Sequence, residues 1–135
     1  MKKELFELEI INTLHNYDVE LIVMAGWMKI VTPFFINKFK NKIINIHPSL
    51  LPAYKGGSAI KDSIINGSKI TGCSVHFVEE EVDSGLLIMQ AALSIRYEDD
   101  IETLTKRIQI LEHKILPHSI SHAGFLIRNN FMENY

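Results

Sequence analysis

The sequence predicts an α/β fold of the doubly wound type, with a mostly parallel sheet and helices on both faces. Residues 3–15 carry apolar side chains every three or four positions, which indicates an amphipathic helix. Residues 19–25 form a nearly continuous apolar run between Asp18 and Gly26, typical of a parallel strand that is covered on both sides. A second apolar segment, 43–47, follows. Alternating helices and strands are the pattern of βαβ units.

Bulk composition is that of one globular domain spanning residues 1–135. Hydrophobic residues make up 47% and charged residues 22% of the chain, and the net charge of -2 argues against a nucleic-acid partner. The single Cys73 fits a reducing compartment. No apolar run approaches the roughly 20 residues that span a bilayer, and acids near the start oppose a secretory signal. We therefore expect a cytoplasmic protein without a membrane partner.

Two helices are predicted around the second strand. Thr32 and Pro33 are a suitable cap and first residue for a short helix that ends before the basic segment 38–42, which we interpret as a solvated helix end. Ser58 is the expected cap of a second helix over about 58–66, closed by the Asn-Gly pair that follows.

The second half of the chain begins with a change of period. Residues 70–78 alternate between two faces, which predicts a strand, and the apolar run 86–92 is expected to pair antiparallel with it at a sheet edge. A helix is predicted over about 100–116, with acids at its start, and Pro117 is expected to end or kink it.

Asn45 and His47 are the first candidates for chemistry. They lie two residues apart on a strand, so both side chains leave by the same face. An amide donor beside an imidazole could serve as an oxyanion donor and a general acid or base. A polar strand end with a hydrogen-bonded histidine explains the same residues equally well.

Other polar groups carry weaker signals. The acids at 79–83 are most simply a solvated turn, because the ligand spacing of a calcium loop is missing. His118 and His122 have helical spacing without an accompanying metal motif, so a metal role is disfavoured. Cys73 is more simply a small core residue than a nucleophile. His76 shares its strand face with small residues and is ambiguous.

Taken together, these segments resemble the formyltransferases that use 10-formyltetrahydrofolate, and within them the branch that acts on glycinamide ribonucleotide in purine synthesis. The resemblance covers roughly residues 15–120 and rests on an ordered set of motifs: Ala-Gly-Trp-Met-Lys-Ile-Val-Thr-Pro at 25–33, Asn-Ile-His-Pro-Ser-Leu-Leu-Pro at 45–52, Thr-Gly-Cys-Ser-Val-His-Phe-Val at 71–78, Asp-Ser-Gly at 83–85, Gln90, Arg-Ile-Gln at 107–109 and Glu-His at 112–113.

The resemblance implies a Rossmann-like formyltransferase domain and a role for each matching residue. Asn45, His47 and Asp83 would be catalytic: Asn45 and a protonated His47 would stabilise the oxyanion, and Asp83 would orient a water and His47. The folate co-substrate would contact Met28, Lys29, Ile30, Val31, Val78, Glu79, Glu80 and Asp83. The ribonucleotide substrate would contact Pro48, His76, Gln109 and Glu112. No metal is implied.

Related families fit less well. Methionyl-tRNA formyltransferases usually carry alanine after the histidine and a further tRNA-binding domain. Formyltetrahydrofolate deformylases share the catalytic trio but differ after it. His47-Pro48-Ser49 and the segment 74–77 favour the glycinamide branch. Hydrolysis of the formyl group, and a folate-binding remnant without turnover, stay open as alternatives.

The chain departs from the family pattern at its beginning. Family members start with a strand and a glycine-rich turn that binds the substrate phosphate, whereas here the first helix leads directly to residues 19–25. Two βα units of roughly 30 residues each would account for the difference. We therefore expect an N-terminally truncated domain with an exposed edge at strand 19–25 and no phosphate loop. A monomer and a homodimer are both compatible with the sequence.

Overall fold

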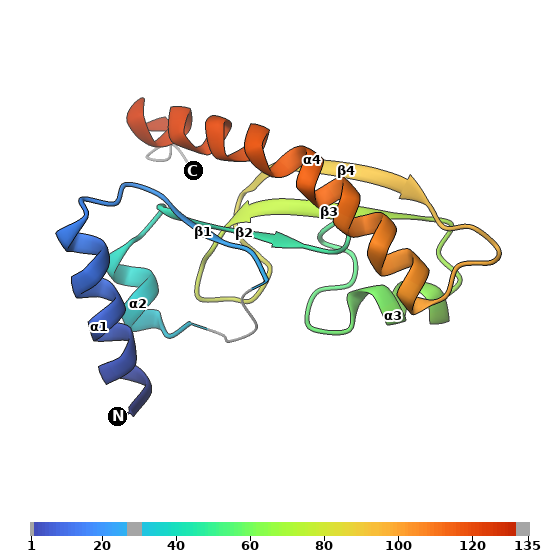
Figure 1. Ribbon diagram of the computed structural model, residues 1–135, viewed down its shortest axis with the longest axis horizontal. Coiled ribbons are helices and arrows are strands. Elements are labelled where there is room, and N and C mark those ends of the chain that lie inside the picture. Colours follow the sequence, from blue (N-terminus) through green and yellow to red (C-terminus); the bar gives the residue numbers. More distant parts are fainter. Residues whose placement is uncertain (1, 27–30, 132–135) are drawn as a thin grey trace.

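The computed structural model describes residues 2–26 and 31–131, and it confirms the α/β fold class. The elements follow each other along the chain and surround one sheet (Figure 1). Their bounds are α1 Lys2–Asn16, β1 Ile22–Met24, α2 Pro33–Lys38, β2 Ile43–His47, α3 Ala59–Ile65, β3 Ile70–Phe77, β4 Leu87–Ser94 and α4 Ile101–Arg128.

The described sheet has four strands in the order β1-β2-β3-β4. β1 pairs parallel with β2, while β2 pairs antiparallel with β3 and β3 antiparallel with β4. The predicted antiparallel pairing at the edge is confirmed, and the sheet around it is mixed. The loop between β3 and β4 is too short for a parallel crossover, which needs a dozen or more residues.

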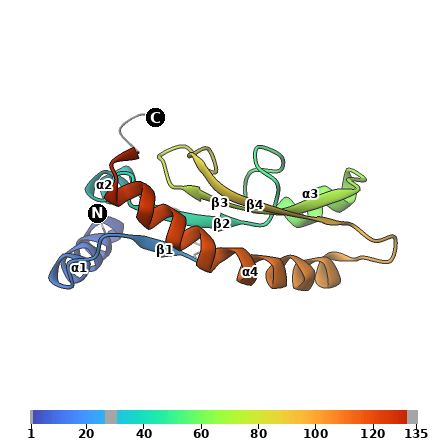
Figure 2. The same cartoon turned by 90° about the horizontal axis from the view of Figure 1, so that it is seen from above.

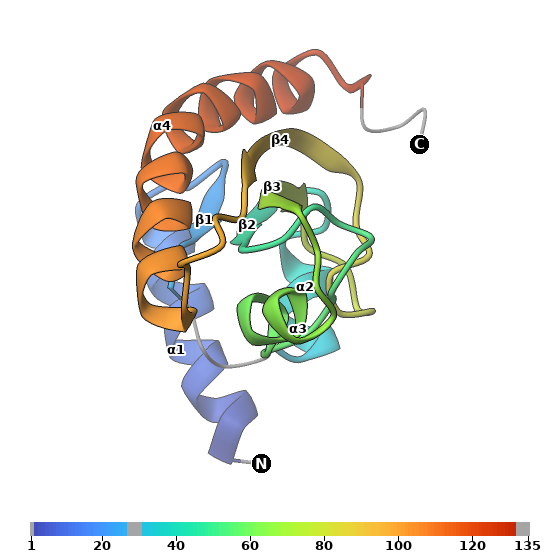
Figure 3. The same ribbon diagram turned by 90° about the vertical axis from the view of Figure 1, so that its right-hand side faces the viewer.

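The two faces of the sheet have different partners. Ile44, Val75 and Phe77 point to one face and pack there against α4, through Leu104 and Ile108. Ile43 points to the opposite face, where a second cluster gathers residues of α1 and α2. Figure 2 shows α4 running along the sheet, and Figure 3 shows α4 and α2 on opposite sides of it. The prediction of helices on both faces is therefore confirmed.

β1 is shorter and less buried than expected. Only three residues pair, all of them half-buried, where the apolar run predicted a covered strand over 19–25. β1 lies at the edge of the sheet formed by the described residues, so one of its sides has no neighbouring strand. The apolar side chains of this run still contribute to both clusters, Val23 to one and Ile22 to the other.

Two helix predictions need correction. The face of α1 expected to be apolar is largely exposed, with Leu5 at 60%, whereas Glu7 is buried at 4%. Glu7 turns inward because its carboxylate accepts hydrogen bonds from Thr32, at the start of α2. Ser58 occupies the cap position of α3, but its side chain makes no capping hydrogen bond. By contrast, Thr32 caps α2 as predicted.

α4 is longer than predicted. It begins at a capping box formed by Asp100 and Thr103, continues through Pro117 and ends at Arg128. The ribbon bends along its length, so that its second half passes over β4 (Figure 3). Proline removes one backbone donor and crowds the preceding turn, which kinks a helix that tertiary packing keeps continuous. No helix in the described part of the chain is both long and apolar enough to cross a membrane.

Candidate active site

The site begins at the carboxyl end of β2, where the chain leaves the sheet. Asn45 pairs with His76 and His47 with Ser74 across the β2–β3 ladder, so these four side chains share one face. That face is opposite to the one covered by α4. The alternation predicted for residues 70–78 is therefore confirmed, and it brings polar groups of two strands together.

The imidazole of His47 is held between two oxygen atoms. Its Nε2 lies 2.8 Å from the carbonyl oxygen of Tyr54, and its Nδ1 lies 3.4 Å from Oδ2 of Asp83. The ring is 6% exposed. Since a carbonyl oxygen can only accept, Nε2 donates to Tyr54, and Nδ1 is the nitrogen that faces Asp83. The longer contact, on the Asp83 side, is the weaker one and the easier to open.

Asp83 connects three parts of the site. It follows β3 in a loop, adopts a positive φ of 54°, and points back toward the sheet. Its Oδ2 accepts a hydrogen bond of 2.8 Å from the backbone N–H of Gly56 and faces His47, while its Oδ1 lies 3.6 Å from Nε2 of His76. The carboxylate therefore joins both histidines to the loop that follows β2.

The Nε2 atom of His76 faces Asp83 and, within the described residues, has no hydrogen-bond donor bound to it. Its Nδ1 donates to the carbonyl oxygen of Phe77 at 2.9 Å, which leaves Nε2 as the unprotonated nitrogen of the neutral ring. Burial lowers the pKa of His76, although the Phe77 carbonyl and Asp83 act in the opposite direction. Nε2 is buried without a hydrogen-bond partner. Nε2 therefore remains an unused acceptor beside the carboxylate of Asp83.

Asn45 completes the polar face. Its amide is half-buried, and within the described part of the chain no protein group bonds it. An amide with free donor capacity beside His47 and Asp83 can donate to a carbonyl oxygen of a ligand. The three residues predicted to be catalytic are thus placed together, with His76 beside them.

A buried network fixes the loop from Pro48 to Gly56. The Ser74 hydroxyl accepts from the Leu51 N–H at 3.0 Å and donates to the Ser49 carbonyl at 2.7 Å. Gln90 of β4 donates to the Ser74 hydroxyl at 2.9 Å and to the Leu51 carbonyl at 3.0 Å. The Ser49 hydroxyl in turn donates to the Ala53 carbonyl at 2.6 Å. This network positions the Tyr54 carbonyl and the Gly56 N–H against His47 and Asp83.

The two helix residues predicted to bind substrate lie on α4. Gln109 is exposed, and Glu112 is half-buried. Burial raises the pKa of the Glu112 carboxyl, and positive charge on His113 and His47 lowers it in part. Glu112 therefore lies within electrostatic range of His47, although α4 packs on the opposite face of the sheet.

The predicted folate contacts are only partly visible. Met28, Lys29 and Ile30 lie outside the described residues. Val31 is half-buried and packs against the α1–α2 cluster. Val78 donates its N–H to the Ile43 carbonyl at 2.8 Å, directly after β3. The side chains of Glu79 and Glu80 are exposed, while Pro48 is half-buried at the start of the loop after β2.

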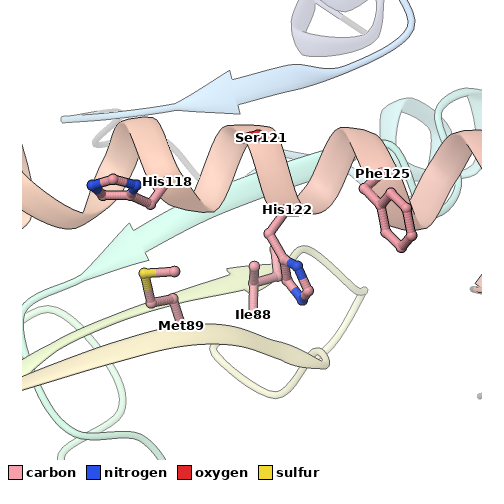
Figure 4. Close-up of a pocket in the computed structure, with 6 residues that line it drawn as sticks. All are labelled: Ile88, Met89, His118, Ser121, His122 and Phe125. Carbon is pink, nitrogen blue, oxygen red and sulfur yellow. The ribbon is translucent and has the colours of Figure 1, made fainter.

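A separate groove lies between α4 and β4. It has a volume of about 480 Å³ and is lined by Ile88, Met89, His118, Ser121, His122 and Phe125. Figure 4 shows the α4 side chains facing those of β4. None of the catalytic candidates lines it. Nowhere in the described part of the chain are three His, Cys, Asp or Glu side chains placed to hold a metal ion.

Sequence reasoning missed two backbone groups and one packing role. The Tyr54 carbonyl and the Gly56 N–H are main-chain groups that bind His47 and Asp83. The identity of a residue does not reveal such a contact, because every residue has a carbonyl and nearly every residue has an N–H. A Cβ at Gly85 would lie 1.7 Å from the Phe77 carbonyl oxygen, so only glycine lets the chain after Asp83 pass this close to the end of β3.

This fold and this cluster define a class of protein. The chain matches the formyl transferase family over residues 1–120 and belongs to that family. It is 43% identical over 118 residues to the phosphoribosylglycinamide formyltransferase of Bacillus subtilis. This match covers 87% of this chain and 60% of the relative. It is 47% identical over 118 residues to the trifunctional purine biosynthetic protein adenosine-3 of Chironomus tentans, covering 87% of this chain and 9% of the relative.

Solved structures agree with the sequence matches. The phosphoribosylglycinamide formyltransferase of Bacillus halodurans superposes with a TM-score of 0.83 at 40% identity, over 92% of this chain and 63% of that structure. The enzyme of Anaplasma phagocytophilum gives a TM-score of 0.81 at 43% identity, over 83% of this chain and 55% of that structure. The chain thus spans 63% or less of the length of these relatives.

Proposed function

We propose that this chain carries the catalytic groups for transfer of a formyl group from 10-formyltetrahydrofolate to the primary amine of glycinamide ribonucleotide. One observation carries the proposal: Asn45, His47 and Asp83 converge at the carboxyl end of β2, with Nδ1 of His47 3.4 Å from Asp83. Membership of the formyl transferase family supports the reaction class, and the relatives named for the glycinamide enzyme support the acceptor.

The residues fit a formyl donor. The folate supplies an activated one-carbon unit. The Asn45 amide, free of protein partners in the described chain, would donate to the formyl oxygen as that oxygen gains negative charge. The imidazolium of His47 would add positive charge at the same point. One such donor is typically worth about 10²–10³ in rate.

Asp83 and the two histidines would handle the proton. The attacking amine must lose a proton, and the leaving folate nitrogen must gain one. Oδ1 of Asp83 and Nε2 of His76 lie 3.6 Å apart and are both acceptors, so either could receive the proton that the amine loses. Nε2 of His47 stays bound to Tyr54, so Nδ1 is the nitrogen that would exchange protons when its contact with Asp83 opens.

A formyl-transfer assay with the full chain tests the proposal. Folate turnover is followed by absorbance over a wide range of ribonucleotide concentrations. His47→Asn and Asn45→Ala should each lower kcat/KM by about 10²–10³. His118→Asn and Asn12→Ala, at exposed positions, are the matched controls and should match the wild type.

Three results would contradict parts of the proposal. A wild-type chain that consumes no formyl donor at any ribonucleotide concentration removes the assigned reaction. Equal release of formate with and without ribonucleotide identifies hydrolysis instead of transfer. Full activity of His47→Asn removes the assignment of the site.

A further inference from the structure

Glu7 is a buried acid far from the catalytic cluster. It lies on α1 at 4% exposure, on a helix whose apolar Leu5 is 60% exposed. No cation pairs with it within the described residues. A buried carboxylate is costly unless its oxygens are hydrogen-bonded, so the contacts that satisfy it point to what it does.

Both carboxylate oxygens of Glu7 bind a single residue. Oε2 accepts from the backbone N–H of Thr32 at 3.1 Å, and Oε1 accepts from the Thr32 hydroxyl. The same hydroxyl accepts from the N–H of Phe35 at 3.4 Å and so caps α2. The carboxylate also lies at the positive end of α2, which favours its charge. Glu7 therefore fixes the point where the chain enters α2.

That point is connected by packing to the strands that carry the site, because Val31 shares a cluster with Ile43 of β2 and with Val78, which follows β3. Thr32 follows the carboxyl end of β1, the edge of a sheet where open α/β folds bind their ligands, and β1 pairs with β2 at Met24 and Asn45. Val31, which belongs to the expected folate contacts, directly precedes Thr32 and packs against the same cluster as Ile11 of α1. The Glu7–Thr32 contact ties this segment to α1.

We propose that Glu7 is a positioning residue for the folate, acting through Thr32 on the segment that enters α2. The inference rests on the proposed function. A pre-positioned segment loses less conformational entropy when it binds a ligand, so breaking the contact should weaken folate binding. It should leave the formyl-transfer step itself unchanged, because Glu7 touches none of Asn45, His47 or Asp83.

Two measurements on the full chain test the inference. Hydrogen–deuterium exchange of peptides covering residues 31–38 reports the Thr32 contact, and titration with 10-formyltetrahydrofolate, followed by the fluorescence of the single tryptophan, reports binding. For Glu7→Ala we expect faster exchange, a roughly tenfold rise in Kd and in KM for folate, and an unchanged kcat at saturation. Glu9→Ala, exposed on the same helix, is the matched control.

Conservative variants separate positioning from loss of fold. Thr32→Ser keeps the hydroxyl and should retain wild-type Kd, whereas Thr32→Val loses it and should resemble Glu7→Ala even if the latter fails to fold. Unchanged exchange in Glu7→Ala and Thr32→Val, or faster exchange with unaltered folate affinity, would overturn the inference alone. A wild-type chain that binds no folate would overturn it together with the proposed function, and an equal drop in kcat would assign Glu7 a general structural role.

Discussion

Replacement of Ser74 by alanine tests the buried network that supports the site. The Ser74 hydroxyl is fully buried and bonds the Leu51 N–H, the Ser49 carbonyl and the Gln90 amide. Gln90 is exposed and keeps its bond to Leu51, so its amide can turn to water. Two buried backbone groups are then left without partners.

The expected cost follows from those two groups. A buried polar group that loses its partner costs about 1–3 kcal/mol, so Ser74→Ala, which leaves two such groups, should lower the free energy of unfolding by about 2–6 kcal/mol. The measurement is urea unfolding at pH 7, read as a lower midpoint at unchanged slope. The control, Ser94→Ala, changes an exposed residue on the adjacent strand and should stay within about 0.5 kcal/mol of the wild type.

The same variant should slow formyl transfer. The loop that Ser74 holds carries the Tyr54 carbonyl and the Gly56 N–H, which orient His47 and Asp83. Ser74→Ala should therefore also increase hydrogen exchange across residues 49–56. A loss of stability below about 1 kcal/mol, with unchanged exchange in the loop, would refute the reasoning, because it would show that the network is not what fixes the loop.

Three further predictions concern single features. Gly85→Ala should cost at least about 3 kcal/mol, since its Cβ would lie 1.7 Å from a strand carbonyl, while Gly57→Ala, with open space around it, should be near neutral in thermal unfolding. Because burial lowers the pKa of His76, the unfolded chain binds more protons than the folded chain below about pH 6.5. Stability should therefore decrease there as the pH is lowered, and His76→Asn should flatten that slope in unfolding titrations. Burial raises the pKa of the Cys73 thiol to about 11, so iodoacetamide at pH 8 should label it only after unfolding; rapid labelling of the native chain would contradict its placement in the core.

Much of the fold was predictable because local patterns and tertiary packing agree. The period-two alternation of β3 and the cap at Thr32 were both correct. The face of α1 was wrong because Glu7 finds hydrogen bonds with a residue 25 positions away, which periodicity cannot register. Pro117 lies inside α4 because contacts with the sheet outweigh the missing backbone bond.

The candidate site was predictable to the level of side chains and no further. The spacing of Asn45 and His47 placed both on one face, and the family resemblance brought in Asp83. The sequence could not show that His47 is bonded through Nε2 to a main-chain carbonyl, because any residue at position 54 offers that atom. Nor could it show that His76 is left with an unpartnered nitrogen, which depends on the tautomer selected by the Phe77 carbonyl.

Because successive side chains of a strand point to opposite faces, the sheet places its reactive side chains on one face and its core side chains on the other. Asn45, His47 and His76 lie on one side of the β2–β3 ladder, and Ile44, Val75 and Phe77 lie on the other. A slip of β3 by one residue against β2 would place His76 under α4 and Val75 in the site, while Asn45 and His47 of β2 kept their face. A chain that mispairs here therefore loses its core and its reactive groups in the same event, so selection for a stable sheet also preserves the alignment of the reactive groups.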